Sequence, residues 1–260
     1  MQLFRSILSR RMLALILCAV LIYVNAFTSV KVFAKVCTNQ PAFRCTANKQ
    51  AEADQAHNND LAITAKAAVL IDNASGRILY AKNKDKKLIP ASITKIMTLL
   101  LIFESIEQGK CKLEDKVTVS EYAASMGGSQ VFLEPGETQD VNTMIKCISI
   151  ASANDAAVAM AEHLAGSEQS FVKRMNKKAK ALGMKHTHFK NCNGLDDSIE
   201  SGHYSSAYDV ALMSQSLVSK YPDISKYSTV WMDAITHITK KGKKKFGLTN
   251  TNKLIRTYQG

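Results

Sequence analysis

An almost wholly apolar run from Ile96 to Phe103 is the feature that most constrains how this chain can fold. A helix that is apolar on nearly every side must lie in the middle of a domain. The run follows the stretch Pro90-Ala91-Ser92-Ile93-Thr94-Lys95. Proline suits a first helical turn, because its missing N–H would be unpaired there anyway. The sequence therefore predicts a buried helix that begins near residue 90 and ends near Gly109.

Ser92 and Lys95 stand three residues apart at the start of this helix, so their side chains share one helical face. Burial and the positive end of the helix dipole both favour the neutral form of a lysine there. A neutral amine can take the proton of a serine hydroxyl and so make it a nucleophile. The same spacing also occurs as a helix cap followed by a surface lysine. The catalytic interpretation is favoured because a lysine is costly to bury in an apolar helix.

A second polar feature, Ser152-Ala153-Asn154, separates two apolar helical stretches. Such a break lets a hydroxyl and an amide point into a cleft. Ser152 could relay a proton to a leaving amine, and Asn154 could hold Lys95 and a substrate carbonyl. The alternative is that Ser152 or Asn154 simply caps the next helix, and the break taken alone favours that alternative.

The amino-terminal residues predict export from the cytoplasm. Three arginines precede an apolar run at residues 12–27, and a cleavage-like Val32-Phe33-Ala34 follows it. The run is short for a membrane span, and Asn25 interrupts it. Residues 1–34 are therefore interpreted as a cleaved signal peptide rather than a retained anchor. We expect a protein that is secreted across the cytoplasmic membrane and is extracellular or associated with the cell wall or membrane.

The formal net charge of the 260 residues is +12, and lysine carries most of it. This charge fits nucleic acid, anionic envelope polymer or lipid headgroups as partners. The predicted signal peptide favours association with the anionic cell envelope over nucleic acid. No Cys-x-x-Cys or His-x-x-x-His pair occurs, so no metal site is expected. Five cysteines follow residue 34, and this odd number argues against a complete disulfide framework, although Cys37 and Cys45 could pair.

Beyond residue 34, composition and periodicity divide the chain into a flexible leader at 35–66 and a folded domain at 67–260. The leader is rich in Asn, Gln, Ala and Lys. The elements expected after the leader are strands at 67–71, 77–80 and 116–119, helices at 141–150, 156–164, 171–182 and 206–219, and an antiparallel hairpin at 229–249 with its turn at 241–242.

Ser92 with Lys95, and then Ser152 with Asn154 about sixty residues later, resemble the motifs of the penicillin-binding serine acyltransferases. The closer resemblance is to the low-molecular-weight D-alanyl-D-alanine carboxypeptidases, and it runs from about residue 67 to residue 260. Further similar stretches include Gly128-Ser129-Gln130-Val131, Asn193-Gly194-Leu195-Asp196 and Asn250-Thr251-Asn252-Lys253-Leu254. The resemblance implies an α+β fold of the β-lactamase/DD-peptidase kind, with an antiparallel sheet packed with helices beside a mostly helical subdomain.

The resemblance also implies a role for each of these residues. Ser92 corresponds to the nucleophile that forms the acyl-enzyme, and its backbone N–H to half of the oxyanion hole. Lys95 corresponds to the base, Ser152 to the proton relay, and Asn154 to the residue that binds substrate beside them. The implied reaction removes the terminal D-Ala from peptidoglycan stem pentapeptides without a metal or organic cofactor. β-Lactams would inhibit by acylating Ser92.

The chain departs from the family's pattern at the third motif, Lys-Thr-Gly or a close variant, which is absent. Lys240-Lys241-Gly242 is only superficially similar, because it falls in the expected hairpin turn and precedes the stretch 250–254, whereas the family's motif follows that stretch. We therefore expect residues 67–260 to be an incomplete catalytic domain, a fragment of a longer protein that lacks the C-terminal strands of the sheet and the C-terminal β-rich domain. A chain that was really this short would lose half the oxyanion hole and expose unpaired sheet edges.

Two other functions compete with the carboxypeptidase. A β-lactamase shares both motifs, but class A enzymes use a glutamate to activate water. No Glu-x-x-Leu-Asn pattern follows Ser152, and the second motif is Ser-Ala-Asn instead of Ser-Asp-Asn, so the peptidase is favoured. The other alternative is a secreted, basic, wall-binding remnant that no longer turns over substrate, because the third motif is absent.

Overall fold

The computed structural model describes residues 62–195, 201–239 and 242–258. The predicted signal peptide, most of the predicted leader, and Cys37 and Cys45 lie outside the described residues. Within these ranges, no helix combines the length and apolar character that a membrane span requires.

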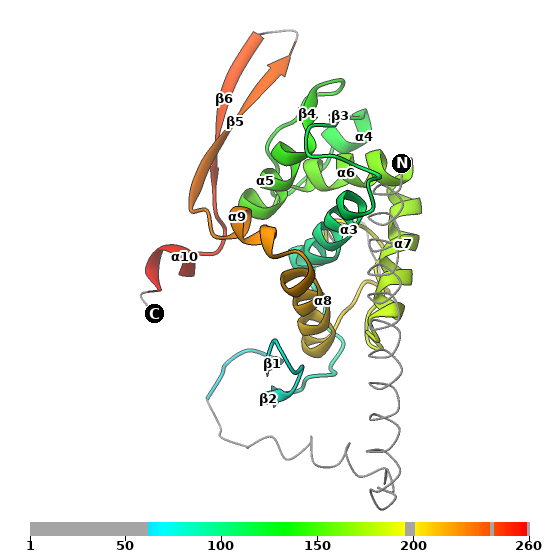
Figure 1. The fold of residues 1–260 in the computed structure, drawn as a ribbon, viewed down its shortest axis with the longest axis vertical. Helices are drawn as coiled ribbons and strands as arrows, with labels where there is room; N and C mark the ends of the chain where they lie inside the picture. Colours follow the sequence, from blue (N-terminus) through cyan, green and yellow to red (C-terminus); the bar gives the residue numbers. More distant parts are fainter. Residues whose placement is uncertain (1–61, 196–200, 240–241, 259–260) are drawn as a thin grey trace, which may run out of the picture. The chain divides into compact units, whose positions relative to one another are not determined.

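The described chain combines helices with antiparallel strand pairs (Figure 1), which confirms the predicted α+β class. In chain order the elements are β1 (Ala68–Ile71), β2 (Ile78–Lys82), the 3-10 helix η2 (Ala91–Thr94), α3 (Lys95–Glu107), β3 (Lys116–Thr118), α4 (Glu121–Ala124), β4 (Thr138–Asp140), α5 (Val141–Ala151), α6 (Asn154–Ala165), α7 (Glu168–Ala181), α8 (Ala207–Lys220), the 3-10 helix η3 (Pro222–Ile224), α9 (Ser225–Ser228), β5 (Met232–Thr239), β6 (Gly242–Thr249) and α10 (Leu254–Thr257).

The described strands form three separate antiparallel pairs, β1 with β2, β3 with β4, and β5 with β6. The longest pair is the predicted hairpin, whose register runs from Met232 opposite Thr249 to Thr239 opposite Gly242. An isolated two-stranded pair is marginally stable in water, so each needs a helix to pack against. Each pair has such a helix: β1 packs on α8, β3 packs on α6, and β5 and β6 pack on α5.

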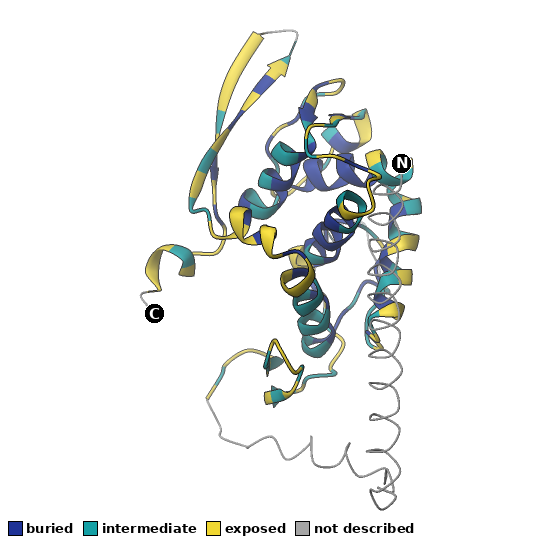
Figure 2. Ribbon diagram, viewed as in Figure 1, coloured by how far each residue is buried: buried dark blue, intermediate teal, exposed yellow. Residues whose placement is uncertain are grey.

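The predicted buried helix is α3, which contacts α5, α6, α7 and α8. Its residues from Met97 to Phe103 are all buried (Figure 2). The neighbouring α6 is buried from Asn154 to Ala161, and its alanines let the helices approach closely. The helix does not begin as predicted, because the chain first forms η2 and only then continues as α helix from Lys95. This arrangement places the first two-thirds of α3, including Lys95, inside the core, whereas its last residues from Glu104 onward are partly or fully exposed.

Candidate active site

The 3-10 helix η2 brings the side chains of Ser92 and Lys95 together. A 3-10 helix has three residues per turn, so side chains at i and i+3 lie directly above one another. Lys95 Nζ is 3.2 Å from Ser92 Oγ and donates a second hydrogen bond to the carbonyl oxygen of Asn193 at 2.8 Å. Ser92 is exposed, whereas only 3% of Lys95 is accessible. The hydroxyl is therefore open to a substrate while the amine beside it is held inside the protein.

The environment of Lys95 favours the neutral amine. Burial lowers the pKa of Lys95 to about 8, and the attraction of the Asp155 carboxylate opposes this shift only in part. The thiol of Cys192 would also stabilise the charged amine if it ionised, but complete burial raises the pKa of that thiol well above its usual range. A pKa near 8 leaves roughly a tenth of the lysine neutral at pH 7 and about half at pH 8. Lys95 can therefore act as a proton acceptor near neutral pH.

The segment 190–195 packs against the start of α3 and hydrogen-bonds to it. The carbonyl of Asn193 accepts from Lys95, and the Thr98 hydroxyl donates to the carbonyl of Cys192 at 2.6 Å. Gly194 has a φ of +83°, and a Cβ built on it would lie 1.8 Å from the carbonyl oxygen of Ala91. No side chain can occupy that position without moving the backbone next to the nucleophile. In the sequence, Asn193-Gly194 stands out only as part of a stretch that resembles the family, whereas in the structure it positions the base.

Ser152 lies at the break between α5 and α6, in the left-handed conformation with φ +56° and ψ +37°. Ser152, Ser92 and Lys95 line one cavity of about 550 Å³. The N-cap of α6 is Ala153, and no side chain makes a capping hydrogen bond there. The structure therefore does not support the helix-cap alternative for Ser152 or Asn154. The left-handed conformation costs a non-glycine residue energy, and such conformations cluster at functional sites.

The rest of this cavity comes from two later parts of the chain. One wall is the segment Asn250–Asn252 after β6, and the other is α8 with the short helices that follow it. Asn250 is buried and donates to the carbonyl of Val230 at 2.8 Å, which fixes the segment after the hairpin. Thr251 N–H donates to the carbonyl of Ile150 at 3.2 Å, which ties the same segment to α5. The bond from Thr251 therefore joins this wall of the cavity to a residue 101 positions earlier in the chain.

Asn154 points toward the loop that precedes β4. Its Nδ2 donates to the carbonyl of Gly127 at 2.8 Å, and its backbone N–H donates to the carbonyl of Ser129 at 2.7 Å. Its Oδ1 is buried and has no hydrogen-bond partner among the described residues. The predicted contact with Lys95 is not formed here, since the bonds of Lys95 Nζ go to Ser92 and Asn193. Its role in binding substrate stays a prediction.

Asp155, which the sequence analysis did not single out, fixes the same loop. Its buried carboxylate accepts from the backbone N–H groups of Val131 and Leu133, each at 3.1 Å, and of Ala156 at 2.9 Å. Burial raises the pKa of this carboxyl, and the three backbone donors counteract that shift. Phe132, between the two loop donors, has a φ of +60° and is exposed. An acidic residue inside the apolar α6 sequence was the signal that could have revealed this role.

Outside this cavity, one cluster in the described residues could hold a metal ion. The ligand atoms of Cys111, Asp115 and His163 all lie within 4.8 Å of one another. The Asp115 carboxylate already accepts from the Lys112 N–H at 2.8 Å, and burial raises the pKa of the Cys111 thiol, which would have to lose its proton to bind a cation. Cys111 and Asp115 are four positions apart, but His163 is far from both in the sequence, so local spacing could not reveal this cluster.

Comparison with known proteins places this chain in a family. The family model for D-alanyl-D-alanine carboxypeptidases, peptidase family S11, matches residues 50–260. The chain is 55% identical over 210 residues to D-alanyl-D-alanine carboxypeptidase DacF of Bacillus subtilis (strain 168), which covers 81% of this chain and 52% of that protein. It is 42% identical over 167 residues to D-alanyl-D-alanine carboxypeptidase DacA of Escherichia coli (strain K12), which covers 62% of this chain and 41% of that protein. The chain thus spans about half the length of the curated relatives it matches.

Solved structures agree with the sequence relatives. The fold matches penicillin binding protein 5 from Haemophilus influenzae with a TM-score of 0.66 and 35% identity, over 74% of this chain and 54% of that one. It also matches the Streptomyces K15 DD-transpeptidase, in an R248L mutant, with a TM-score of 0.68 and 27% identity, over 76% of this chain and 78% of that one. The chain therefore belongs to peptidase family S11, the D-alanyl-D-alanine carboxypeptidases.

Proposed function

We propose that this chain carries the acyl-transfer machinery of a serine D-alanyl-D-alanine carboxypeptidase. The observation that supports it most strongly is the 3.2 Å approach of Lys95 Nζ to an exposed Ser92 Oγ, with the pKa of the lysine near 8. Ser152 lines the same cavity. A nucleophile, a base and a second hydroxyl in one cavity are the groups that acyl transfer requires.

In the acylation step Ser92 Oγ attacks the carbonyl carbon of the penultimate D-Ala, and its proton passes to Lys95 Nζ. The backbone N–H of Ser92 is in the first turn of η2, where N–H groups have no intrahelical acceptor, so it can stabilise the oxyanion. The C–N bond then breaks, and the proton returns from Lys95 through the Ser152 hydroxyl to the leaving amine. D-Ala departs and an ester remains on Ser92.

In the deacylation step a water molecule attacks the ester carbonyl. Its proton is taken by Lys95, which is neutral again after the first step. The C–O bond to Ser92 breaks, and Oγ recovers a proton from Lys95. The Asn193 carbonyl serves both steps, because it accepts a hydrogen bond from the charged and from the neutral amine and so keeps Nζ in place.

The proposed substrate is a peptidoglycan stem pentapeptide that ends in D-Ala-D-Ala, and the proposed inhibitors are β-lactams. The relatives at 55% and 42% identity are named for this activity, and a structural neighbour is named as a penicillin-binding protein. A substrate of this kind lies in the cell envelope, which agrees with the export predicted from residues 1–34. Secretion and envelope association are therefore part of the proposal.

The test is release of D-Ala from a stem pentapeptide, together with labelling by a fluorescent penicillin. The proposal predicts D-Ala release and a covalent label in the parent protein, and neither in Ser92→Ala. Steady turnover of nitrocefin at a rate above that of D-Ala release would favour a β-lactamase instead. A well-folded parent that takes no label would support a wall-binding protein without turnover.

A further inference from the structure

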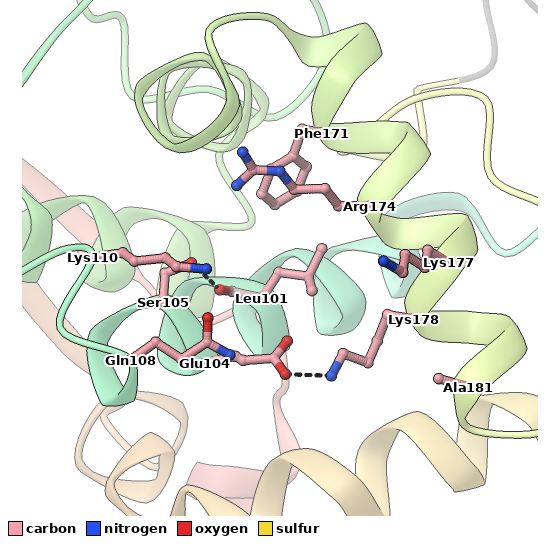
Figure 3. A pocket seen from close by; sticks show the side chains of 10 residues that line it. All are labelled: Leu101, Glu104, Ser105, Gln108, Lys110, Phe171, Arg174, Lys177, Lys178 and Ala181. Carbon is pink, nitrogen blue, oxygen red and sulfur yellow. Dashed lines mark hydrogen bonds and ion pairs between the residues drawn. The ribbon is translucent and has the colours of Figure 1, made fainter.

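A second cavity, of about 300 Å³, lies at the opposite end of α3 from Ser92, between that helix end and α7 (Figure 3). Its basic lining consists of Lys110, Arg174, Lys177 and Lys178, and among the described residues Glu104 is the only acidic one that lines it. Nine residues separate Lys95 from Glu104, which is roughly 14 Å along a helix. This cavity is therefore distinct from the candidate active site.

The charges of this cavity are not balanced. Glu104 is already paired with Lys178 (Figure 3). In the described ranges no carboxylate lies within 4 Å of the charged groups of Lys110, Arg174 or Lys177. Arg174 donates one N–H to the carbonyl of Leu164, and a guanidinium has further donors to offer. Three cations around one small space repel each other, and a bound anion would relieve that repulsion.

The dipole of α3 opposes an anion at this end of the helix, so the strength of the dipole has to be compared with the attraction of the basic side chains. The C-terminal end of α3 carries partial negative charge, which disfavours an anion, but the effect of the dipole is weak and falls off within the last turn. Several lysine and arginine side chains act on one anion at once, and each carries a full charge. The lining therefore favours an anion despite its place at a helix C-terminus.

We propose that this cavity binds a phosphodiester group of a polyol-phosphate polymer. Arginine offers a planar pair of donors that matches phosphate oxygens, and lysines add point charges around it. Ser105 and Gln108 provide polar contacts, and the aliphatic stems of the lysine and arginine side chains offer apolar surface for the carbon atoms of a polyol. The binding does not depend on the proposed acyl transfer.

A membrane surface fits this site less well. Protein surfaces that lie on a bilayer combine a basic face with exposed large apolar side chains that enter the acyl layer. Among the described residues, the exposed large apolar side chains are on other elements, and none belongs to α7 or to the C-terminal half of α3. A hollow with basic walls suits a single chain of phosphates better than a flat layer of headgroups.

The experiment measures binding of a synthetic glycerol-phosphate oligomer by isothermal titration calorimetry at low salt. The test variant is Arg174→Gln with Lys177→Gln, and Lys110→Gln is a second variant on another segment. The matched control is Lys173→Gln with Lys180→Gln, which removes two charges from exposed positions of the same helix that do not line the cavity. We expect the double test variant to bind at least tenfold more weakly, Lys110→Gln severalfold more weakly, and the control within about twofold of the parent.

Three results would overturn the proposal. One is a parent protein that does not bind the oligomer at millimolar concentration. Another is an equal loss in the test and control variants, which would show that only the general positive charge of α7 matters. The third is binding to phosphatidylglycerol vesicles that the oligomer does not displace, which would identify a membrane surface as the partner.

Discussion

The backbone carbonyl of Asn193 accepts a hydrogen bond from Lys95 Nζ at 2.8 Å, although the two residues are 98 positions apart. The base is therefore held by a segment that contributes no catalytic side chain. The nucleophile, in contrast, is placed by η2, in the residues immediately before the base. Changes in the 190–195 segment should therefore disturb the placement of Lys95 Nζ and, at Gly194, also the backbone next to Ser92.

The substitution Gly194→Ala tests this relationship. A Cβ there would lie 1.8 Å from the carbonyl oxygen of Ala91, so the backbone beside Ser92 must move. Gly183→Ala is the control, because Gly183 has a similar φ of +75° but nothing within 4 Å of its Cβ. We expect Gly183→Ala to lower the free energy of unfolding by about 1–2 kcal/mol and to keep the rate of penicillin labelling. Gly194→Ala should lower the free energy of unfolding further than Gly183→Ala does, and it should reduce the labelling rate at least tenfold. Equal stability and equal labelling rates in the two variants would contradict the role of the 190–195 segment in positioning the base.

Replacing Lys95 by methionine should stabilise the protein while ending its chemistry. The pKa of Lys95 falls from 10.5 to about 8 on burial, so below pH 8 the folded state carries a buried charge at a cost of about 3 kcal/mol. The unfolded chain binds more protons between pH 8 and 10.5, so parent stability rises over that range. Allowing about 1 kcal/mol for the lost bond to Asn193, Lys95→Met should gain about 2 kcal/mol at pH 7. Urea unfolding at pH 7 and pH 10 measures this gain, which should shrink at the higher pH; a variant less stable than the parent at pH 7 would refute it.

Ser152→Ala should slow acylation without abolishing it, because the relay assists a step that Ser92 and Lys95 can still perform. Proton transfer by a positioned group contributes typically 100- to 10,000-fold, and a lost relay should cost part of that. Ser152→Gly separates the effect of losing the hydroxyl from the effect of backbone strain. Glycine tolerates the φ of +56°, which alanine does not favour. Single-turnover labelling should be slow in both variants. Normal labelling in Ser152→Gly would mean that only the backbone conformation matters.

Asp155→Asn should destabilise the protein and slow acylation. Its carboxylate accepts from three backbone N–H groups, and an asparagine would place an N–H₂ donor against some of them, at a cost of about 1–3 kcal/mol. Asp209→Asn is a control, because Asp209 is also buried and accepts from the His186 N–H and the Thr187 hydroxyl, but does not bond the loop that Asp155 holds. Thermal unfolding should show both losses of stability, whereas stopped-flow acylation should slow only in Asp155→Asn. Equal acylation rates would limit Asp155 to a purely structural role.

Much of the site could be predicted because its signals are local. Three-residue spacing places Ser92 beside Lys95, and the apolar sequence that follows predicts the burial of the amine. The break at Ser152 is also a local signal, since it interrupts two periodic stretches. The strands at 67–71 and 77–80 were recognised from the apolar run and the turn residues between them, and the hairpin from alternation and its turn.

What could not be predicted depends on contacts between distant segments. Nothing near Asn193 indicates that its carbonyl will meet an amine from α3, and a glycine in a turn does not reveal that Ala91 lies against it. The direction of the Asn154 amide could not be predicted from the sequence either, because Gly127 becomes its partner only when the loop folds over α6. The three-residue strand β4 was too short to show alternation.

The most direct test of the account is the rate at which a penicillin acylates the protein between pH 6 and pH 10, with the adduct located by peptide mass spectrometry. Lys95 must be neutral to take the proton, and burial sets its pKa at about 8. The account predicts an adduct on the peptide that contains Ser92, a rate that rises about tenfold per pH unit up to pH 8 and then levels off, and no adduct in Lys95→Ala. An adduct on another peptide, or a rate that Lys95→Ala leaves unchanged, would contradict it.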